Sequence, residues 1–226
     1  MSHPLDRPVW SALTGPQSAL ALVDRGARRY APEYAMFAAL DDAAPGTLAG
    51  LGALVGAHGD VAIVEPDEPP PIPATRVVST TLCWQMIAGG PMAAPQPSFE
   101  TTPLGDEDAA EMLALATLTR PGPYFRRTHT LGAFVGAKED GRLVAMAGER
   151  MRPHGFTEVS GVCTHPDQRG RGYGSALLAL VASRICDRGE VPFLHAYADN
   201  RGAIALYEHL GFAFRRELVM TVLTAA

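Results

Sequence analysis

The sequence predicts a mixed α/β (α+β) fold, and three observations carry this prediction. Residues 156–175 have the pattern of a buried strand, a short turn and a glycine-rich entry into a helix. The pair Asp140-Gly141 between two apolar runs is a hairpin signal. From residue 98 onward, short β-branched runs and amphipathic helical runs follow one another along the chain.

The strand that begins at Phe156 contains the apolar residues Val162 and Cys163, and it ends before Pro166, which has no backbone donor. Glycine then occupies every second position of the segment 170–174, just ahead of a helical run. The first amides of a helix have no partner inside the helix and lie at the positive end of its dipole. This entry therefore predicts a site for an anion such as a phosphate or pyrophosphate.

The other elements of the second half are predicted from apolar periodicity and from turn and cap residues. The predicted strands are 98–104, 130–136, 142–152, 191–197 and 212–223. The predicted helices are 106–118, 173–187 and 200–210. Acidic residues open the first of these helices at its positive end, Asn200 caps the last one, and Gly211 stops it.

Residues 1–95 differ from the rest of the chain in their charge and in their lack of readable motifs. They hold 5 basic and 9 acidic side chains, against 14 and 15 in residues 96–226. No phosphate loop, metal-ligand spacing or nucleophile motif is readable in them. We predict an N-terminal α/β region of unknown role over residues 1–95, and a decayed copy of the second half remains open. The elements expected there are a helix at 18–30, strands at 61–64 and 81–87, a proline-rich extended loop at 65–73 and a linker at 89–97. In the expected helix, Arg25, Arg28 and Arg29 lie on the outer side.

Composition bounds the function without naming it. Apolar residues make up 47% of the chain and charged residues 19%, as in ordinary globular proteins. The net charge of −5 argues against a nucleic-acid surface. Three cysteines without a Cys-x-x-Cys spacing suggest neither a disulfide framework nor a zinc site. No leader pattern and no apolar run of spanning length is readable, so we expect a cytoplasmic enzyme without a membrane partner.

Two common phosphate loops do not fit the glycine-rich segment. A Walker loop needs a lysine, and the only lysine of the chain is Lys138. A dinucleotide fingerprint needs Gly-x-Gly-x-x-Gly, whereas Gly170, Gly172 and Gly174 give Gly-x-Gly-x-Gly. An ordinary strand-to-helix turn remains the alternative for this segment taken alone.

Two motifs together resemble the GNAT N-acetyltransferase superfamily. Arg169-x-x-Gly172-x-Gly174 after a strand resembles its acyl-CoA-binding motif. Downstream, the segment 200–212 is similar to its Asn…Ala-x-x-Leu-Tyr-Glu-x-x-Gly-Phe signature. The order β-α-β-β-β-α-β-α-β over residues 96–226 is the order of that fold. The resemblance implies a GNAT acetyltransferase domain there, with a central, mostly antiparallel mixed sheet flanked by helices.

The resemblance also implies an acetyl-CoA-dependent N-acetyltransferase, with acetyl-CoA as co-substrate and direct transfer to a primary amine. The loop amides would hold the pyrophosphate, and the backbone of the strand before the loop would pair with the pantetheine arm, one amide polarising the thioester carbonyl. Cys163 would take part through its backbone and not as a nucleophile. The residues expected to bind the co-substrate are Val162, Cys163, Thr164, Arg169, Gly170, Arg171, Gly172, Tyr173, Gly174, Ser175 and Asn200.

By the same resemblance, Tyr207 is the expected general acid, because the matching tyrosine of many relatives protonates the leaving thiolate. A free tyrosine has a pKa of ~10, near enough to the ~8.5 of a thiol for donation. Glu158, on the strand before the loop, is the expected base, directly or through water, and Glu149 is its competitor. The structural alternatives are a buried aromatic for Tyr207 and a rim salt bridge for either glutamate. His154, His165 and His195 could also relay protons, and none has metal-ligand spacing.

Several alternatives stay open. The acyl-CoA-binding motif does not distinguish one acyl chain from another, so transfer of a longer acyl group is possible. A CoA-binding or regulatory module without turnover is the alternative from another class. The acceptor is a small-molecule or peptide amine that the sequence does not identify, and a homodimer is compatible with the resemblance.

Overall fold

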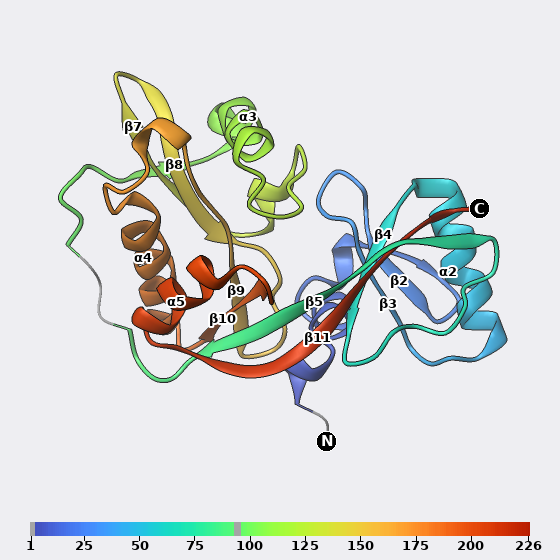
Figure 1. The fold of residues 1–226 in the computed structure, drawn as a ribbon. Helices are drawn as coiled ribbons and strands as arrows, with labels where there is room; N and C mark the ends of the chain where they lie inside the picture. The colour runs from blue at the N-terminus through green and yellow to red at the C-terminus, as the bar shows by residue number, and fades with distance from the viewer. Residues whose placement is uncertain (1–2, 93–95) are drawn as a thin grey trace.

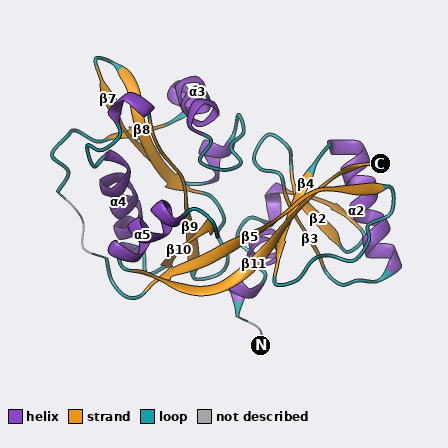
Figure 2. Ribbon diagram, in the orientation of Figure 1, coloured by secondary structure: helices purple, strands orange, loops and turns teal. Residues whose placement is uncertain are grey.

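The computed structural model describes residues 3–92 and 96–226, drawn in Figures 1 and 2. The strands are β1 (Ala21–Asp24), β2 (Ala27–Tyr30), β3 (Phe37–Leu40), β4 (Val61–Glu65), β5 (Thr75–Ala88), β6 (Thr102–Leu104), β7 (Phe134–Glu139), β8 (Arg142–Glu149), β9 (Phe156–Thr164), β10 (Val191–Tyr197) and β11 (Phe212–Ala225). The α-helices are α1 (Pro8–Thr14), α2 (Pro45–His58), α3 (Ala109–Thr119), α4 (Tyr173–Asp187) and α5 (Arg201–His209). The strands join one sheet in the order β1-β2-β3-β4-β11-β5-β10-β9-β8-β7-β6. Among the strands of the described residues, only β3–β4 and β9–β10 pair in parallel, so the predicted mixed class is confirmed.

The second half has the predicted order of elements, but the strand predicted over 130–136 lies at Phe134–Glu139, after a 3-10 helix at Thr128–Leu131. Strand β10 and helix α4 have the predicted limits, and the apolar face of α4 is buried at Leu177, Leu178 and Ile185. In the turn between β7 and β8, Asp140 and Gly141 have φ values of 49° and 77°. Positive φ at both central residues is the geometry that an Asp-Gly hairpin turn requires.

The helix predicted over residues 18–30 is wrong, because β1 and β2 form a hairpin there. The prediction placed Arg29 on a solvent-facing side, but only 1% of this residue is exposed. Its guanidinium donates hydrogen bonds to the carbonyl oxygens of Gly59 (2.7 Å) and Asp60 (3.3 Å), just after α2. A cation at that end of a helix is stabilised by the helix dipole, so this arginine can be buried.

Helix α2 was not predicted, because four glycines make its sequence look like a loop. Two of them allow close packing. A Cβ at Gly50 would lie 2.4 Å from the carbonyl oxygen of Asp24, and one at Gly52 would lie 2.2 Å from that of Pro73. Glycine therefore lets α2 lie directly against the neighbouring backbone, which offsets its poor helix propensity.

The sheet has the same strand pattern on its two sides. Read from one edge, β1, β2, β3 and β4 pair antiparallel, antiparallel and parallel, and β4 then pairs antiparallel with β11. Read from the other side, β7, β8, β9 and β10 pair in the same three ways, and β10 then pairs antiparallel with β5. Helix α2 connects β3 to β4 as α4 connects β9 to β10. Each side is thus completed by the long strand that follows the other side in the sequence.

Figure 1 shows this arrangement as two lobes. We call the part with β1–β4 and α2 the N-lobe and the part with β7–β10 and α3–α5 the C-lobe; β5 and β11 run side by side from one to the other. The domain boundary predicted at residue 95 stays a prediction. It falls within the expected linker 89–97, of which residues 93–95 lie outside the described residues.

Strands β9 and β10 diverge, and this divergence positions the site. They pair in parallel only from Phe156–Val191 to Glu158–Phe193, after which no register is shared. Beyond that point β9 is paired on its other side with β8, and β10 with β5. The facing edges of β9 and β10 are therefore free of sheet partners around Val162 and Tyr197.

Within residues 3–92 and 96–226, no helix has both the length and the apolar character needed to cross a membrane. In the same residues, no three or more histidine, cysteine or carboxylate side chains gather closely enough to hold a metal ion.

Candidate active site

A cavity lies beside the glycine-rich loop, between the diverging strands and helices α3 and α5. We call it the loop-side cavity. Six residues that the sequence singled out for co-substrate binding line it together: Val162, Cys163, Thr164, Arg169, Gly174 and Asn200. The Asn200 side chain also accepts a hydrogen bond from the Ala203 amide (3.2 Å), so its predicted role as the cap of α5 is confirmed.

The loop is shaped as an anion-binding entry to α4. Gly170 and Gly172 have φ values of 77° and 81°, which side chains with a Cβ rarely adopt. Gly174, in the first turn of α4, faces strand β9: a Cβ there would lie 3.3 Å from the Thr164 hydroxyl. The backbone of the first helical turn is therefore bare on the side of the cavity, as close approach of a phosphate requires.

Three other residues predicted to bind the co-substrate, Arg171, Tyr173 and Ser175, make contacts within the protein instead. The hydroxyl of Tyr173 donates to the carboxylate of Glu139, and Arg171 is paired with the same carboxylate at 2.9 Å. Ser175 donates its hydroxyl to the Gly172 carbonyl at 2.9 Å. The contacts of Tyr173 and Arg171 tie the loop to the end of the β7–β8 hairpin, and none of the three residues lines the loop-side cavity. Their predicted direct contact with a co-substrate stays a prediction.

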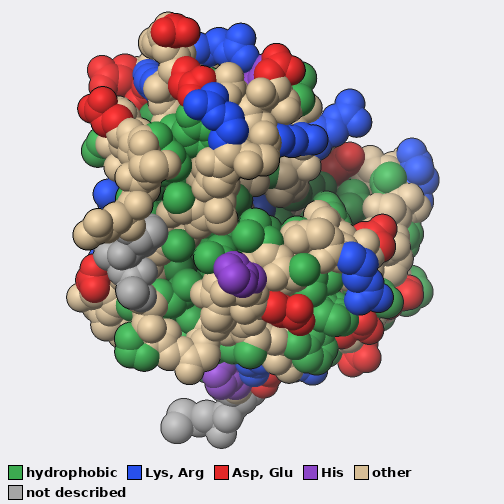
Figure 3. Space-filling model, turned by 60° about the vertical axis from the view of Figure 1, so that its left-hand side comes forward, with side chains coloured by type: hydrophobic (Ala, Val, Ile, Leu, Met, Phe, Trp, Pro, Cys, Tyr) green, Lys and Arg blue, Asp and Glu red, His purple; other side chains and the backbone are tan. Residues whose placement is uncertain are grey.

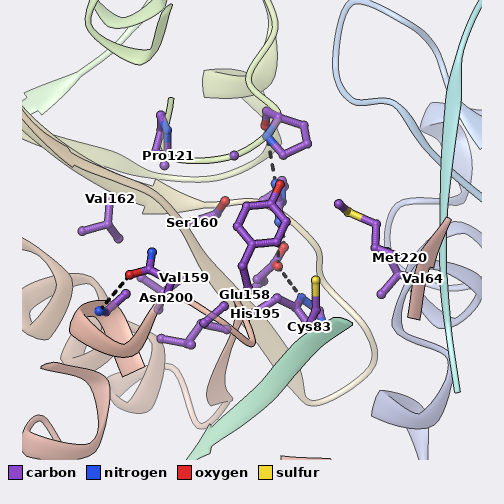
Figure 4. Close-up of a pocket in the computed structure, with 18 of the residues that line it drawn as sticks. Val64, Cys83, Pro121, Glu158, Val159, Ser160, Val162, His195, Asn200 and Met220 are labelled. Atoms are coloured by element: carbon purple, nitrogen blue, oxygen red, sulfur yellow. Dashed lines mark hydrogen bonds and ion pairs between the residues drawn. The ribbon is translucent and has the colours of Figure 1, made fainter. Parts of the chain in front are cut away.

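A second cavity lies between the lobes, and we call it the inter-lobe cavity. Phe37, Val64 and Cys83 line it from β3, β4 and β5, and Met220 lines it from β11. Figure 4 shows Val64 and Met220 on one side of it and Ser160 and Val162 on the other. In Figure 3, hydrophobic side chains gather where the surface is hollowed. The side of this cavity formed by Phe37, Val64, Cys83 and Met220 is apolar.

The two cavities meet at Tyr207. Its side chain, on α5, lines both of them, as do Tyr197, Asn200 and Val162. Burial raises the pKa of the Tyr207 hydroxyl above its ordinary value, so the phenol is protonated at neutral pH. A group held in one cavity and a group held in the other would therefore come together beside a proton donor.

Glu158 lies on the floor of the inter-lobe cavity, fully buried in an ion pair with Arg150. Arg150 donates through Nε to Oε2 (2.8 Å) and through Nη2 to Oε1 (2.8 Å). His195 contacts Oε1 through Nδ1 at 2.8 Å, drawn as a dashed line in Figure 4, and the Met151 amide donates to Oε2 at 3.4 Å. Burial by itself would raise the pKa of Glu158, but Arg150 and His195 outweigh it and lower the pKa to about 2.

Four donors occupy the roughly four lone-pair positions of this carboxylate. Glu158 is thus ionised but a weak base with no position left for a further donor. The prediction that it takes a proton from the amine meets a physical objection in this arrangement. Its competitor Glu149 is buried in an ion pair with Arg188 (2.8 Å) and lines neither cavity.

The tautomer of His195 follows from its neighbours. Nδ1 faces the ionised Glu158 and must carry a proton. Nε2 faces Nε2 of the buried Gln85 at 3.2 Å. That amide is oriented by two other partners, because its Nε2 donates to the Leu5 carbonyl (2.9 Å) and its Oε1 accepts from Arg215 (2.8 Å). Nε2 of His195 therefore accepts the hydrogen bond from Gln85.

The two other histidines considered as relays lie elsewhere. His165 accepts a hydrogen bond from the Asp167 amide (3.3 Å), and neither it nor His154 lines the two cavities. Cys163 is buried, and burial raises the pKa of its thiol to about 11, which suits the expectation that it is not a nucleophile.

Sequence reasoning missed Arg150, Gln85 and Arg120. Arg120, just after α3, lines the loop-side cavity together with Arg169 and adopts a left-handed φ of 51°. Its position after a helix and before Pro121 was a readable C-terminal signal, but its approach to the loop is a tertiary contact. Arg150 and Gln85 carry no local signal at all, since their partners lie on other strands.

Comparisons with known proteins agree with this geometry. The family model described as FR47-like protein matches residues 134–220. A solved structure from Novosphingobium aromaticivorans, assigned to the GNAT family of acetyltransferases, is 47% identical, with a TM-score of 0.92 and full coverage of both chains. A GCN5-related N-acetyltransferase from Kribbella flavida is 18% identical, with a TM-score of 0.67 over 99% of this chain and 96% of that one, and shows the same fold.

Two curated relatives each match about a third of the chain. A mycothiol acetyltransferase from Thermomonospora curvata is 37% identical over 78 residues, which are 34% of this chain and 26% of the relative. The N-alpha-acetyltransferase RimI from Mycobacterium tuberculosis is 37% identical over 83 residues, which are 35% of this chain and 51% of the relative. The matched segments thus span between about a quarter and a half of those relatives' own lengths.

Proposed function

This chain belongs to the GNAT family of acetyltransferases, and we propose that it transfers an acetyl group from acetyl-CoA to a primary amine held between its two lobes. The observation that carries the proposal is the meeting of the loop-side and inter-lobe cavities at Tyr207. The loop-side cavity would hold the co-substrate and the inter-lobe cavity the acceptor.

The residues of the loop-side cavity fit a CoA thioester. The bare first turn of α4 at Gly174 and the cations Arg120 and Arg169 suit a pyrophosphate. The free facing edge of β9 around Val162 offers backbone groups to an extended amide-containing arm, as an added strand would use them. Acetyl-CoA, when bound, supplies an acetyl group activated as a thioester.

In this proposal Tyr207 donates its phenolic proton to the thiolate as the C–S bond breaks. Glu158 acts as a positioning residue that keeps Arg150 and His195 in place. The N-lobe provides one wall of the acceptor site through Phe37 and Val64. That role accounts for an N-lobe that repeats the strand pattern of the C-lobe but lacks a glycine-rich phosphate loop in its own sequence.

Thermal shift with acetyl-CoA and free CoA, followed by thiol release on a panel of amines, tests the proposal. We expect stabilisation by both ligands and thiol release that depends on the amine. Binding without thiol release on any amine would favour a CoA-binding module instead. The same assay with propionyl-CoA and butyryl-CoA distinguishes acetyl transfer from transfer of a longer acyl group.

Replacing Gly174 by valine should weaken acetyl-CoA binding about tenfold or more, because the added methyl groups would extend toward Thr164 and Val162. Isothermal titration calorimetry measures the change in Kd. The matched control is Gly56→Val in α2, where a Cβ meets nothing within 4 Å and the residue is exposed. An unchanged Kd in Gly174→Val would place the co-substrate elsewhere.

A further inference from the structure

The polar groups on the floor of the inter-lobe cavity are already saturated by one another. Six titratable side chains line this cavity: Cys83, Arg150, Glu158, His195, Tyr197 and Tyr207. Glu158 is the only carboxylate among these lining residues, and Arg150 neutralises it through two hydrogen bonds of 2.8 Å. Its remaining positions receive His195 and the Met151 amide.

His195 offers no free lone pair either. Its Nδ1–H donates to Glu158 and its Nε2 accepts from Gln85. What remains for a ligand are the hydroxyls of Tyr197, Tyr207 and Ser160, the side-chain amide of Asn200, the Cys83 thiol and backbone groups. All of these are neutral at physiological pH, and burial raises the pKa of both tyrosines and raises that of Cys83 to about 11.

An ammonium ion would enter such a cavity at a large cost. Moving a cation out of water without a carboxylate partner is unfavourable by several kcal/mol. A neutral amine has no such penalty, and its substituent can use the apolar walls formed by Phe37, Val64 and Met220. The cavity therefore discriminates by the charge of the acceptor nitrogen.

Because the charged groups on the cavity floor are paired with one another, we infer that the acceptor is a weakly basic amine that is uncharged at neutral pH. It would have an apolar body and belong to the arylamine, hydrazine or alkoxyamine class. The inference rests on the proposed function and specifies its substrate class. It also removes the need for a separate base.

With a neutral amine, Tyr207 alone can carry out both proton transfers of the reaction. The lone pair of the neutral amine forms the C–N bond, the C–S bond breaks, and the thiolate receives the proton of Tyr207. The nitrogen then loses one proton to the tyrosinate, which restores Tyr207. An ammonium acceptor has one further proton to lose, and none of the described residues that line the cavity is a free base that could take it.

Pairs of amines with the same shape and different basicity test the inference. O-Benzylhydroxylamine and 2-phenylethylamine differ only by an oxygen in place of a methylene, and only the second is an ammonium ion at neutral pH. We expect kcat/KM for O-benzylhydroxylamine to be flat between about pH 6 and pH 8, after subtraction of the uncatalysed reaction. For 2-phenylethylamine it should rise about tenfold per pH unit, following the neutral fraction.

Thiol release, with mass spectrometry of the acetylated product, gives both profiles. A plateau for 2-phenylethylamine near neutral pH would show that the enzyme itself removes the ammonium proton and would overturn the inference, while the proposed function would stand. Binding of acetyl-CoA with no transfer to either amine, nor to phenylhydrazine or benzylamine, would overturn both.

A new carboxylate in the cavity should shift the preference toward the ammonium acceptor. Ser160 lies on β9, lines the inter-lobe cavity and is labelled in Figure 4. In Ser160→Asp the ratio of kcat/KM for 2-phenylethylamine to that for O-benzylhydroxylamine at pH 7 should rise about tenfold. Ser79→Asp, on an exposed stretch of β5, is the matched control and should leave the ratio unchanged. Equal ratios in the two variants, each still stabilised by acetyl-CoA, would contradict the inference.

Discussion

Tyr207→Phe should lower kcat by about 10²–10⁴-fold, the usual contribution of a positioned general acid. The substitution removes one oxygen at the place where the loop-side and inter-lobe cavities meet. The aromatic ring and its edge contact with Phe212 (ring centroids 6.5 Å apart) are retained, so the fold should not change. Steady-state thiol release measures kcat, and calorimetry with acetyl-CoA should give an unchanged Kd.

Tyr197→Phe is the control for this prediction, because Tyr197 lines the same two cavities. We expect its kcat to fall by less than tenfold. Similar losses of kcat in Tyr207→Phe and Tyr197→Phe would mean that neither tyrosine is the specific donor.

The wild-type enzyme should also show the raised pKa of Tyr207 in its pH dependence. Because burial raises this pKa, the tyrosine should stay protonated above the ordinary value of ~10, and kcat should fall only as the pH rises through the raised pKa.

Arg150→Met should lower the free energy of unfolding by about 3–5 kcal/mol, because it leaves the fully buried Glu158 without its cation. In a chain of this length the loss corresponds to a decrease in Tm of roughly 6–20 °C. The guanidinium also stacks over the ring of Phe37 at 4.7 Å, a contact between the lobes that methionine preserves only in part. Chemical denaturation followed by circular dichroism measures the change.

The double variant Arg150→Met/Glu158→Gln separates a lost ion pair from lost packing. Removing both charges leaves no uncompensated buried charge, so the double variant should be more stable than Arg150→Met alone. If the double variant instead loses as much stability as Arg150→Met and Glu158→Gln lose together as single variants, the contribution of the pair comes from packing and not from charge. Arg171→Met breaks the pair with Glu139, whose two side chains are 55% and 30% exposed, and should cost about 1 kcal/mol or less.

The loop and the helices around it could be predicted from the sequence because their signals are local. Gly170 and Gly172 have left-handed φ, and Asn200 caps α5 through the amide three residues later. These features need only a few neighbouring residues to be recognised. The resemblance to the GNAT signature then predicted how these elements follow one another in the fold. The solved relative of 47% identity has the same fold.

The floor of the inter-lobe cavity could not be predicted in the same way. Glu158 was singled out for its place on a strand, but its chemistry depends on Arg150 and His195, which lie 8 and 37 positions away. Gln85 fixes the tautomer of His195 across 110 positions and from the other half of the chain. Arg29 misled the helix prediction for the same reason, because its partners at residues 59 and 60 follow a helix that glycines concealed.

The exchange of β5 and β11 between the two sides of the sheet has a consequence for how this polypeptide can be divided. Strand β10 needs β5 as its neighbour, and β4 needs β11, so a fragment cut near residue 95 keeps an exposed edge where its missing neighbour belonged. Neither piece would be a self-sufficient folding unit. Expressed apart, each should be insoluble, and expressed together in one cell they should reassemble into a single noncovalent heterodimer.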